Sequence, residues 1–159
     1  HPSRYLDTGE ITKAIQEFVS HEGDHQQKFA SGIAIDFEDC SECYLDENKS
    51  LTNEEKEEIY WIVREAVNNS IKHAWDSDSA NNQGKTIKVK VGSPLTRAHQ
   101  SIRRSLINRK KRFNGSITPM LVVITVTDNG KGLQTVSGRK SGTEDMRRRA
   151  EDIGAEWSL

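Results

Sequence analysis

One segment of this chain, "MLVVITVT" at residues 120–127, restricts the possible folds more than any other. It is apolar on both faces and rich in β-branched side chains, which is the pattern of a strand buried on both sides. Hydrophobic residues make up only 33% of the 159 residues, which indicates one thin core. We therefore expect 120–127 to be the central strand of a single domain that spans residues 1–159.

Periodicity in the first part of the chain predicts the elements that come before this strand. Apolar residues at i, i+3, i+4, i+7 and i+8 predict a helix over 10–21. Alternating apolar residues predict strands in "GIAIDF" at 32–37 and in "TIKVKV" at 86–91. Between them, Thr52 is followed three residues later by Glu55, a capping-box pattern that begins a helix from about 53 to 75.

A last helix is predicted after Gly142, with Gly154 as its stop and "AEWSL" as the start of another strand. The resulting order is helix, strand, helix, strand, strand, helix. Such an order predicts an α/β two-layer sandwich in which helices cover one face of a mixed sheet.

Charge and composition exclude some classes of function. The net charge of −1 gives no reason to expect nucleic acid as a partner. No apolar run approaches the roughly 20 residues that a membrane span needs, and the first ten residues lack the apolar stretch of a signal peptide. We expect a cytoplasmic domain, with any membrane anchor in segments upstream of it.

The predicted helix 53–75 has two different stripes. Glu65, Asn69 and Lys72 lie at i, i+4 and i+7 and share one face. The apolar or small residues of the other stripe are Ile59, Val63, Ala66, Ser70 and Ala74. We interpret the second stripe as the core face and the first as a candidate chemical face, although a solvated polar stripe is the more common meaning of this spacing.

Two glycine-containing segments lie further along the chain. "DNGKGL" at 128–133 follows the apolar strand, and its glycines allow a sharp turn and a close approach to a flat ligand, or simply an ordinary turn. "SGTEDMRRRA" at 141–150 begins a helix whose exposed amides can hold phosphate, or marks only a glycine-assisted helix start.

Together and in this order, the three segments resemble the ATP-binding domain of the GHKL superfamily, which includes sensor histidine kinases, gyrase-type topoisomerases, mismatch-repair ATPases and heat-shock chaperone ATPases. "REAVNNSIKHA" at 64–74 resembles the asparagine box and "DNGKGL" the first glycine box. "GTEDMRRRA" is similar to the run that marks the short-lidded sensor kinases of the nitrate-sensor type, except that Thr143 replaces a leucine. The resemblance implies the Bergerat ATP-binding fold.

The resemblance also implies a role for each matching residue. Glu65 is expected to be the catalytic general base, Asn69 to ligate Mg²⁺ through its amide oxygen, and Asp128 to accept a hydrogen bond from the adenine amino group. The remaining residues expected to bind ATP contact the phosphates, wrap the base or lie under a short lid at 134–141, and they are Lys72, His73, Gly130, Gly132, Gly142, Thr143 and Met146.

A basic insertion at about 93–118 separates two strands that a sensor kinase joins by a short turn. Seven of its residues are arginine or lysine between positions 97 and 112. Leu95, Ala98, Ile102, Leu106 and Phe113 could form an apolar helical stripe. We interpret the insertion as a solvated loop or partly ordered helix, with a docking surface for an acidic partner or membrane face as the alternative. The end at "AEWSL" suggests truncation or a shortened fold.

A metal site elsewhere is a weaker possibility. Cys40 and Cys43 form a single CxxC, and His21 and His25 lie upstream at i and i+4. These four residues could bind zinc, but one CxxC without a second pair more often means free cysteines.

The function that the resemblance implies is transfer of the ATP γ-phosphoryl group to a histidine on a separate dimerisation domain, and from there to a response regulator. His1 precedes a proline, as acceptor histidines do, but lacks their sequence surroundings. The domain alone is therefore expected to bind ATP without phosphorylating itself. The alternatives are a serine kinase of the anti-sigma type, which the run Met146–Ala150 disfavours, and a degenerate nucleotide-binding interaction module.

Overall fold

The computed structural model describes residues 10–28, 31–39, 51–76, 84–92, 111–113, 116–118, 123–132, 141–155 and 157–158. The elements in chain order are α2 (Ile11–Lys28), β1 (Ile33–Asp39), α4 (Asn53–His73), β2 (Lys85–Gly92), β3 (Lys111–Phe113), β4 (Ser116–Thr118), β5 (Val123–Asp128) and α5 (Ser141–Asp152). The predicted order of helices and strands is confirmed, with β3 and β4 added inside the basic insertion.

The main sheet is mixed and has the strand order β1-β2-β5. β1 pairs with β2 in parallel and β2 pairs with β5 in antiparallel orientation. Among the strands that the structure describes, β2 and not β5 is the middle one, so the expectation that 120–127 is the central strand is wrong for this sheet. The residues of β5 from Val123 to Val126 are all buried, so the burial on both faces that the apolar pattern predicted is confirmed. Burial does not require a hydrogen-bonded strand on each side.

The register of the sheet separates an apolar face from a polar one. Ile35, Ile87 and Asp128 form one cross-strand row, and Phe37, Val89 and Val126 form the next row on the same face. On the opposite face the row is Glu38, Lys90 and Thr125, where the Lys90 ammonium lies 2.9 Å from the Glu38 carboxylate. Because side chains alternate along a strand, Asp128 at the end of β5 lies on the apolar face.

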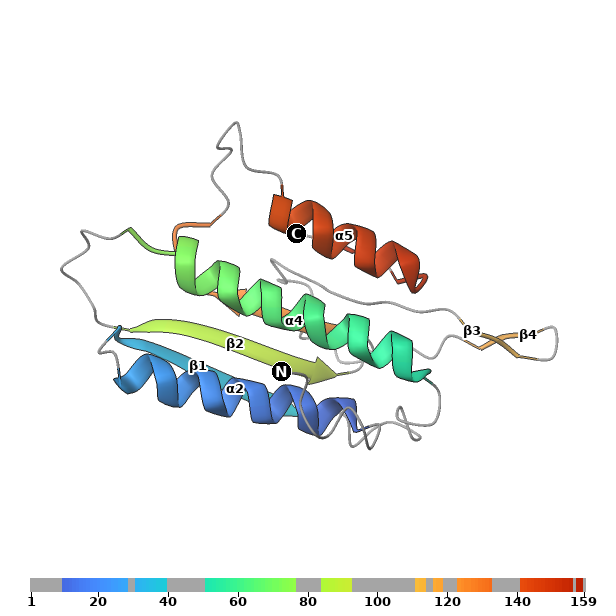
Figure 1. The fold of residues 1–159 in the computed structure, drawn as a ribbon, viewed down its shortest axis with the longest axis horizontal. Coiled ribbons are helices and arrows are strands. Elements are labelled where there is room, and N and C mark those ends of the chain that lie inside the picture. Colours follow the sequence, from blue (N-terminus) through green and yellow to red (C-terminus); the bar gives the residue numbers. More distant parts are fainter. Residues whose placement is uncertain are drawn as a thin grey trace.

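The helices cover this apolar face, as predicted. In Figure 1, α2 and α4 cross in front of the sheet, and α5 lies beside α4. One cluster of buried side chains draws residues from α2, β1, α4, β2, β5 and α5. The molecule is thus a small α+β protein with a two-layer arrangement. In the part of the chain that the structure describes, no helix has the length and apolar character needed to cross a membrane.

α4 has the start that its sequence predicts. The Glu55 backbone N–H donates to Thr52 Oγ1 at 3.2 Å, and the Thr52 N–H donates to Glu55 Oε2 at 2.8 Å, which completes the capping box. Such a cap stabilises a helix by about 1 kcal/mol. α2 instead continues to Lys28, seven residues beyond the predicted end at 21. Its last two turns bury only Gln26, so they carry no apolar periodicity that could have revealed them.

The basic insertion contains a short antiparallel hairpin. β3 pairs with β4, and Phe113 is the partner of Ser116. The expectation of a loop or partly ordered helix is therefore wrong for 111–113 and 116–118, and Phe113 lies on a strand rather than on a helical stripe. The dipeptide Asn114-Gly115 between the strands is typical of two-residue hairpins, and it was the overlooked sequence signal. Residues 93–110 lie outside the described part of the chain.

Candidate functional site

The second half of α4 is the part of the molecule where the three sequence motifs meet. The stripe predicted to face the core does so, since Ile59, Val63, Ala66, Ser70 and Ala74 are all buried. Glu65 and Asn69, on the neighbouring stripe, are partly exposed. The start of α5 and the turn after β5 both contact this half of the helix.

The start of α5 lies directly against Glu65 and Asn69. A Cβ atom added at Gly142 would lie 3.1 Å from Glu65 Oε1 and 3.2 Å from the Asn69 amide nitrogen. These separations are tighter than ordinary carbon contacts, so glycine is the residue that lets the backbone come this close without displacing either side chain. The first amides of α5 and two polar side chains of α4 therefore share one small region.

The turn after β5 contacts α4 one residue further along, at Ser70. The Ser70 hydroxyl donates to Asp128 Oδ2 at 2.7 Å, and the Gly130 N–H donates to Asp128 Oδ1 at 3.1 Å. Each carboxylate oxygen thus accepts a hydrogen bond from a different element. Asp128 itself is partly exposed, while Ser70 is fully buried.

Gly130 packs against the end of α4. A Cβ at Gly130 would lie 2.2 Å from the Ala74 carbonyl oxygen, which is too close for any side chain. The Lys131 N–H donates to that same carbonyl at 2.8 Å, and the Lys131 ammonium lies 2.5 Å from the Asp76 carboxylate. Gly132 has a φ of 77°, the left-handed region that glycine adopts readily. Gly130 therefore allows the turn to pack closely against the end of α4, and Gly132 supplies the left-handed conformation two residues later.

Asn129 ties the same turn to the start of β2. Its backbone N–H donates to the Thr86 carbonyl at 3.2 Å, and its side-chain oxygen accepts from the Thr86 N–H at 2.9 Å. Its amide nitrogen also donates to the Gly84 carbonyl. The sequence pattern predicted only a ligand-binding segment or an ordinary turn at 128–133, because the contact of Asn129 with β2 depends on the pairing of β2 with β5.

The other candidate residues lie at different depths. Lys72 and His73 are exposed in the last turn of α4, and Thr143 is partly buried in the first turn of α5. Met146 is 2% exposed and belongs to the central apolar cluster. Of the lid predicted at 134–141, residues 134–140 lie outside the described part of the chain and Ser141 is the first residue of α5.

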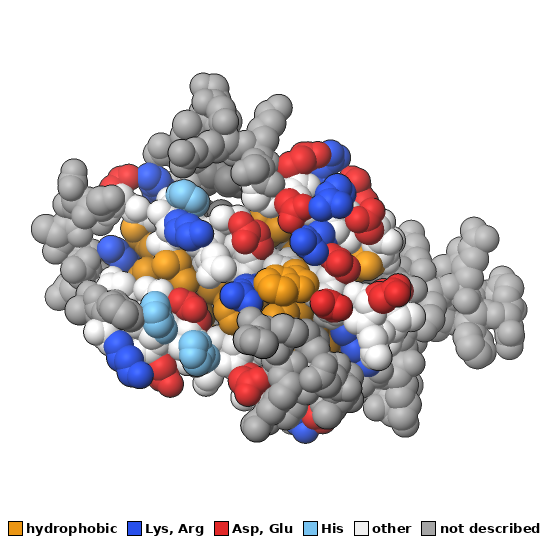
Figure 2. All heavy atoms as spheres, in the orientation of Figure 1, with side chains coloured by type: hydrophobic (Ala, Val, Ile, Leu, Met, Phe, Trp, Pro, Cys, Tyr) orange, Lys and Arg blue, Asp and Glu red, His pale blue; other side chains and the backbone are white. Residues whose placement is uncertain are grey.

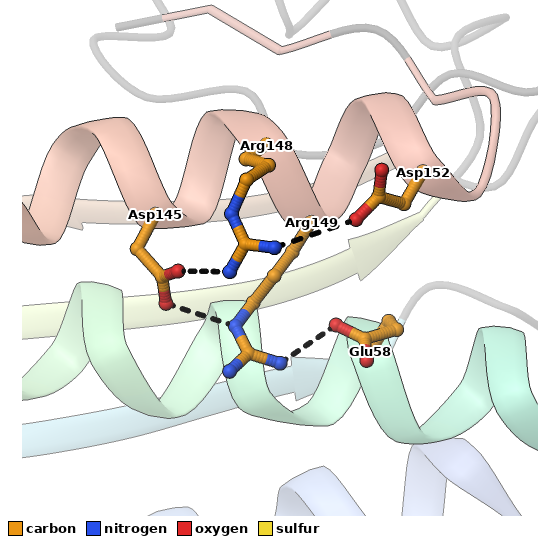
Figure 3. A network of polar contacts seen from close by, with 5 residues as sticks. All are labelled: Glu58, Asp145, Arg148, Arg149 and Asp152. Atoms are coloured by element: carbon orange, nitrogen blue, oxygen red, sulfur yellow. Dashed lines mark hydrogen bonds and ion pairs between the residues drawn. The ribbon is translucent and has the colours of Figure 1, made fainter.

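α5 and α4 run in opposite directions and are joined by an ion pair far from Gly142. The Arg149 guanidinium donates to Glu58 on α4 at 2.8 Å and to Asp145 on α5 at 3.0 Å (Figure 3). Gly142 meets Glu65 and Asn69, whereas Arg149, seven residues later, meets Glu58 earlier on α4. Arg149 therefore fixes the α5 end opposite to the one that lies against the candidate site.

Charged side chains on the exposed face of α5 pair with one another. Arg147 contacts Glu144 and Glu151, and Arg148 contacts Asp145 and Asp152. Figure 2 shows these acidic and basic groups intermixed over the helix. Hydrogen bonds from Arg148 and then from Arg149 lower the pKa of Asp145, because they favour its charged form.

No group of three or more His, Cys, Asp or Glu side chains among the described residues is arranged to hold a metal ion. His21 and His25 lie on α2, but Cys40 and Cys43 lie outside the described part, so the zinc alternative stays a prediction. A magnesium ion bound to nucleotide phosphates needs fewer protein ligands, often one or two oxygens. Side-chain oxygens of Asn69 and Glu65 lie beside the start of α5.

Comparison with family models, with curated proteins and with solved structures yields no match to this chain. The chemistry of the site must therefore be argued from its own residues. The site combines three features. Asp128 is a carboxylate held by two donors, and Glu65 and Asn69 place a carboxylate and an amide on one stripe of α4. The third feature is the amino end of α5, where Gly142 has no side chain to cover the backbone.

Proposed function

We propose that this chain is the ATP-binding catalytic domain of a two-component sensor histidine kinase, built as a Bergerat form of the α/β sandwich. The observation that carries the proposal is the meeting of three separated motifs on one half of α4. Gly142 lies against Glu65 and Asn69, and Asp128 is bonded to Ser70, the residue that follows Asn69. This places the carboxylate of Asp128, the polar stripe of α4 and the first amides of α5 around one part of the molecule, as a single nucleotide site requires.

Asp128 has the properties that recognition of an adenine base requires. An ionised carboxylate only accepts hydrogen bonds, and the donors Ser70 and Gly130 hold its two oxygens in a defined orientation. The amino group of adenine is a donor, whereas guanine presents a carbonyl at the same position. A carboxylate facing that carbonyl would be left without its partner, and the binding site would favour ATP.

The region around Gly142 has the properties that a phosphate group requires. The first amides of a helix have no partner within the helix, and the helix dipole adds partial positive charge there. The absence of a side chain at Gly142 opens the backbone to close approach. Asn69 would be a neutral oxygen ligand for Mg²⁺, and Glu65 on the same stripe would act as general base.

The remaining candidates would have supporting roles. Lys72 and His73 are exposed one turn beyond Asn69, where they could contact phosphate oxygens. Gly132 and Thr143 belong to the two backbone segments on either side of the lid. Met146 is part of the core, so we infer that it sets the position of α5 rather than contacting the nucleotide. Bound Mg²⁺-ATP would supply the phosphoryl group that is transferred.

The test is phosphotransfer to a separately supplied dimerisation domain that carries an acceptor histidine. We expect the domain to bind ATP with Mg²⁺, to label that histidine from γ-labelled ATP and to leave itself unlabelled. The variant Glu65→Gln keeps the shape of the side chain and removes its charge. It should bind ATP but transfer far less of the γ-phosphoryl group to the acceptor histidine. Tight ATP binding without any transfer would contradict kinase activity and favour a nucleotide-binding interaction module.

A further inference from the structure

Ser70 occupies an unusual position for a hydroxyl group. It lies on the core-facing stripe of α4 between Ala66 and Ala74, and its exposed fraction is 0%. Burying a hydroxyl that makes no hydrogen bond costs free energy, so a buried serine is expected to form one. Its hydroxyl donates a hydrogen bond to Asp128, 58 residues further along the chain.

This bond joins two elements at the point where the base would be recognised. The hydroxyl donates to Oδ2 of Asp128 at 2.7 Å, which is the ordinary length for a bond to an oxygen acceptor. The Gly130 N–H donates to Oδ1 at 3.1 Å. A donor on each oxygen fixes the plane of the carboxylate, and an ionised carboxylate only accepts hydrogen bonds.

The two donors differ in what they contribute. Gly130 belongs to the same turn as Asp128, so its bond moves with the turn. Ser70 belongs to α4, which also carries Asn69, the preceding residue, and Glu65, five residues earlier. The Ser70 hydroxyl therefore fixes the position of the Asp128 carboxylate relative to α4, the helix that carries Asn69 and Glu65. A carboxylate can accept about four hydrogen bonds, so a base amino group can be accepted alongside these donors.

We propose that Ser70 is a specificity-determining positioning residue, which holds Asp128 as an oriented acceptor for a 6-aminopurine and against a 6-oxopurine. This inference rests on the proposed function, since it assumes that Asp128 faces the base. The additional element is that Ser70, a buried residue that would not contact the nucleotide, contributes to the preference for ATP over GTP.

The test compares ATP and GTP binding by isothermal titration calorimetry in the wild-type protein and in Ser70→Ala. Alanine suits a buried helical position, so the variant is expected to fold. We expect its ATP affinity to fall on the order of tenfold, as for loss of a hydrogen bond to a charged group, while GTP affinity changes much less. The ratio of the two affinities should therefore fall on the order of tenfold. Ser70→Thr, which keeps the hydroxyl, should restore the ratio.

Val67→Ala is the matched control, because Val67 is fully buried on the same helix and belongs to the apolar cluster. It should lower the thermal midpoint while leaving the ATP to GTP ratio unchanged. If Ser70→Ala binds ATP and GTP in the wild-type ratio, Ser70 is only structural and the inference is wrong, although the proposed function stands. If the wild-type protein shows no preference for ATP, both the inference and the adenine assignment fail.

Discussion

Asp128 lies where a strand, a turn and a helix meet, and its contacts explain why a small change there should have a large effect. Its two oxygens accept bonds from Ser70 and Gly130. An asparagine at this position would have one oxygen and one amide group. The amide nitrogen would replace one acceptor oxygen by a donor, so the side chain could no longer accept from Ser70, Gly130 and a base amino group with two oxygens.

We therefore predict that Asp128→Asn weakens ATP binding by about 1.5–3 kcal/mol, the range for a hydrogen bond to a charged group. Titration calorimetry with ATP in the presence of Mg²⁺ measures this directly. GTP binding should change less, since guanine offers no amino group at that position. Equal loss for both nucleotides would mean that Asp128 supports the fold and does not recognise the base.

Gly142 offers a second prediction at the scale of one residue. An alanine Cβ there would press on Glu65 and Asn69 at about 3 Å, so both side chains would have to move. We expect Gly142→Ala to lower the affinity for Mg²⁺-ATP by about tenfold while the fold is kept. Its thermal unfolding should stay close to that of the wild-type protein.

Gly23→Ala is the control for this substitution. Gly23 lies within α2, and a Cβ there would meet only the Ile35 carbonyl at 3.8 Å, an ordinary contact. Replacing glycine by alanine inside a helix should stabilise the protein by roughly 0.5–1 kcal/mol. ATP affinity should not change. If both variants bound ATP like the wild-type protein, the start of α5 would not be part of the site.

At the scale of elements, the position of α5 depends on its packing and on one ion pair with α4. Met146 and Ala150 are buried against the core, and Arg149 reaches Glu58 across 91 residues of sequence. The antiparallel arrangement puts this pair and the Gly142 contact at opposite ends of α5. A change in the tilt of the helix would therefore alter the distance between Gly142 and Asn69.

We predict that Arg149→Ala lowers stability by about 0.5–1 kcal/mol and also weakens Mg²⁺-ATP binding. Arg148→Ala is the matched control, because the partners of Arg148, Asp145 and Asp152, lie on α5 itself. It should leave nucleotide affinity unchanged. Urea unfolding and calorimetry measure the two effects, and equal nucleotide affinity in both variants would contradict the positioning role of Arg149.

The same network predicts how stability depends on pH. Arg148 and Arg149 lower the pKa of Asp145 in the folded state, so the folded protein binds fewer protons there than the unfolded chain. The stabilisation is complete above the ordinary pKa of about 3.9 and is lost as the pH falls through the lowered folded-state value. Asp145→Asn should therefore destabilise the protein at pH 7 and have little effect near pH 2. Urea unfolding at both pH values measures the difference, and an equal effect at both would exclude this linkage.

At the scale of the whole molecule, the sequence predicted local features well and long-range contacts poorly. The capping box of α4, the core stripe and the alternation in β1 and β2 depend on neighbours a few residues apart, and all were found. The middle position of β2 and the hairpin β3–β4 were missed. Strand order depends on pairing partners far along the chain, and the hairpin depends on a turn signal that was overlooked.

In the candidate site, too, sequence patterns indicated single residues but not the contacts between distant ones. Sequence motifs identified Glu65, Asn69, Asp128 and Gly142, but not that a buried serine would bond to Asp128 or that Asn129 would join the turn to β2. A hydroxyl on an apolar stripe has many possible partners, and only the packing of α4 on the sheet selects one. The ion pair of Arg149 with Glu58 could not be predicted either, because it depends on how α5 packs against α4.

The central claim is that one nucleotide lies between the second half of α4 and the turn after β5. A crystal structure of the domain with Mg²⁺ and a non-hydrolysable ATP analogue tests it most directly. We predict that the adenine amino group lies within hydrogen-bonding distance of the Asp128 carboxylate and that the metal is bound by the Asn69 side-chain oxygen. A nucleotide bound elsewhere, or a base that makes no contact with Asp128, would contradict this account.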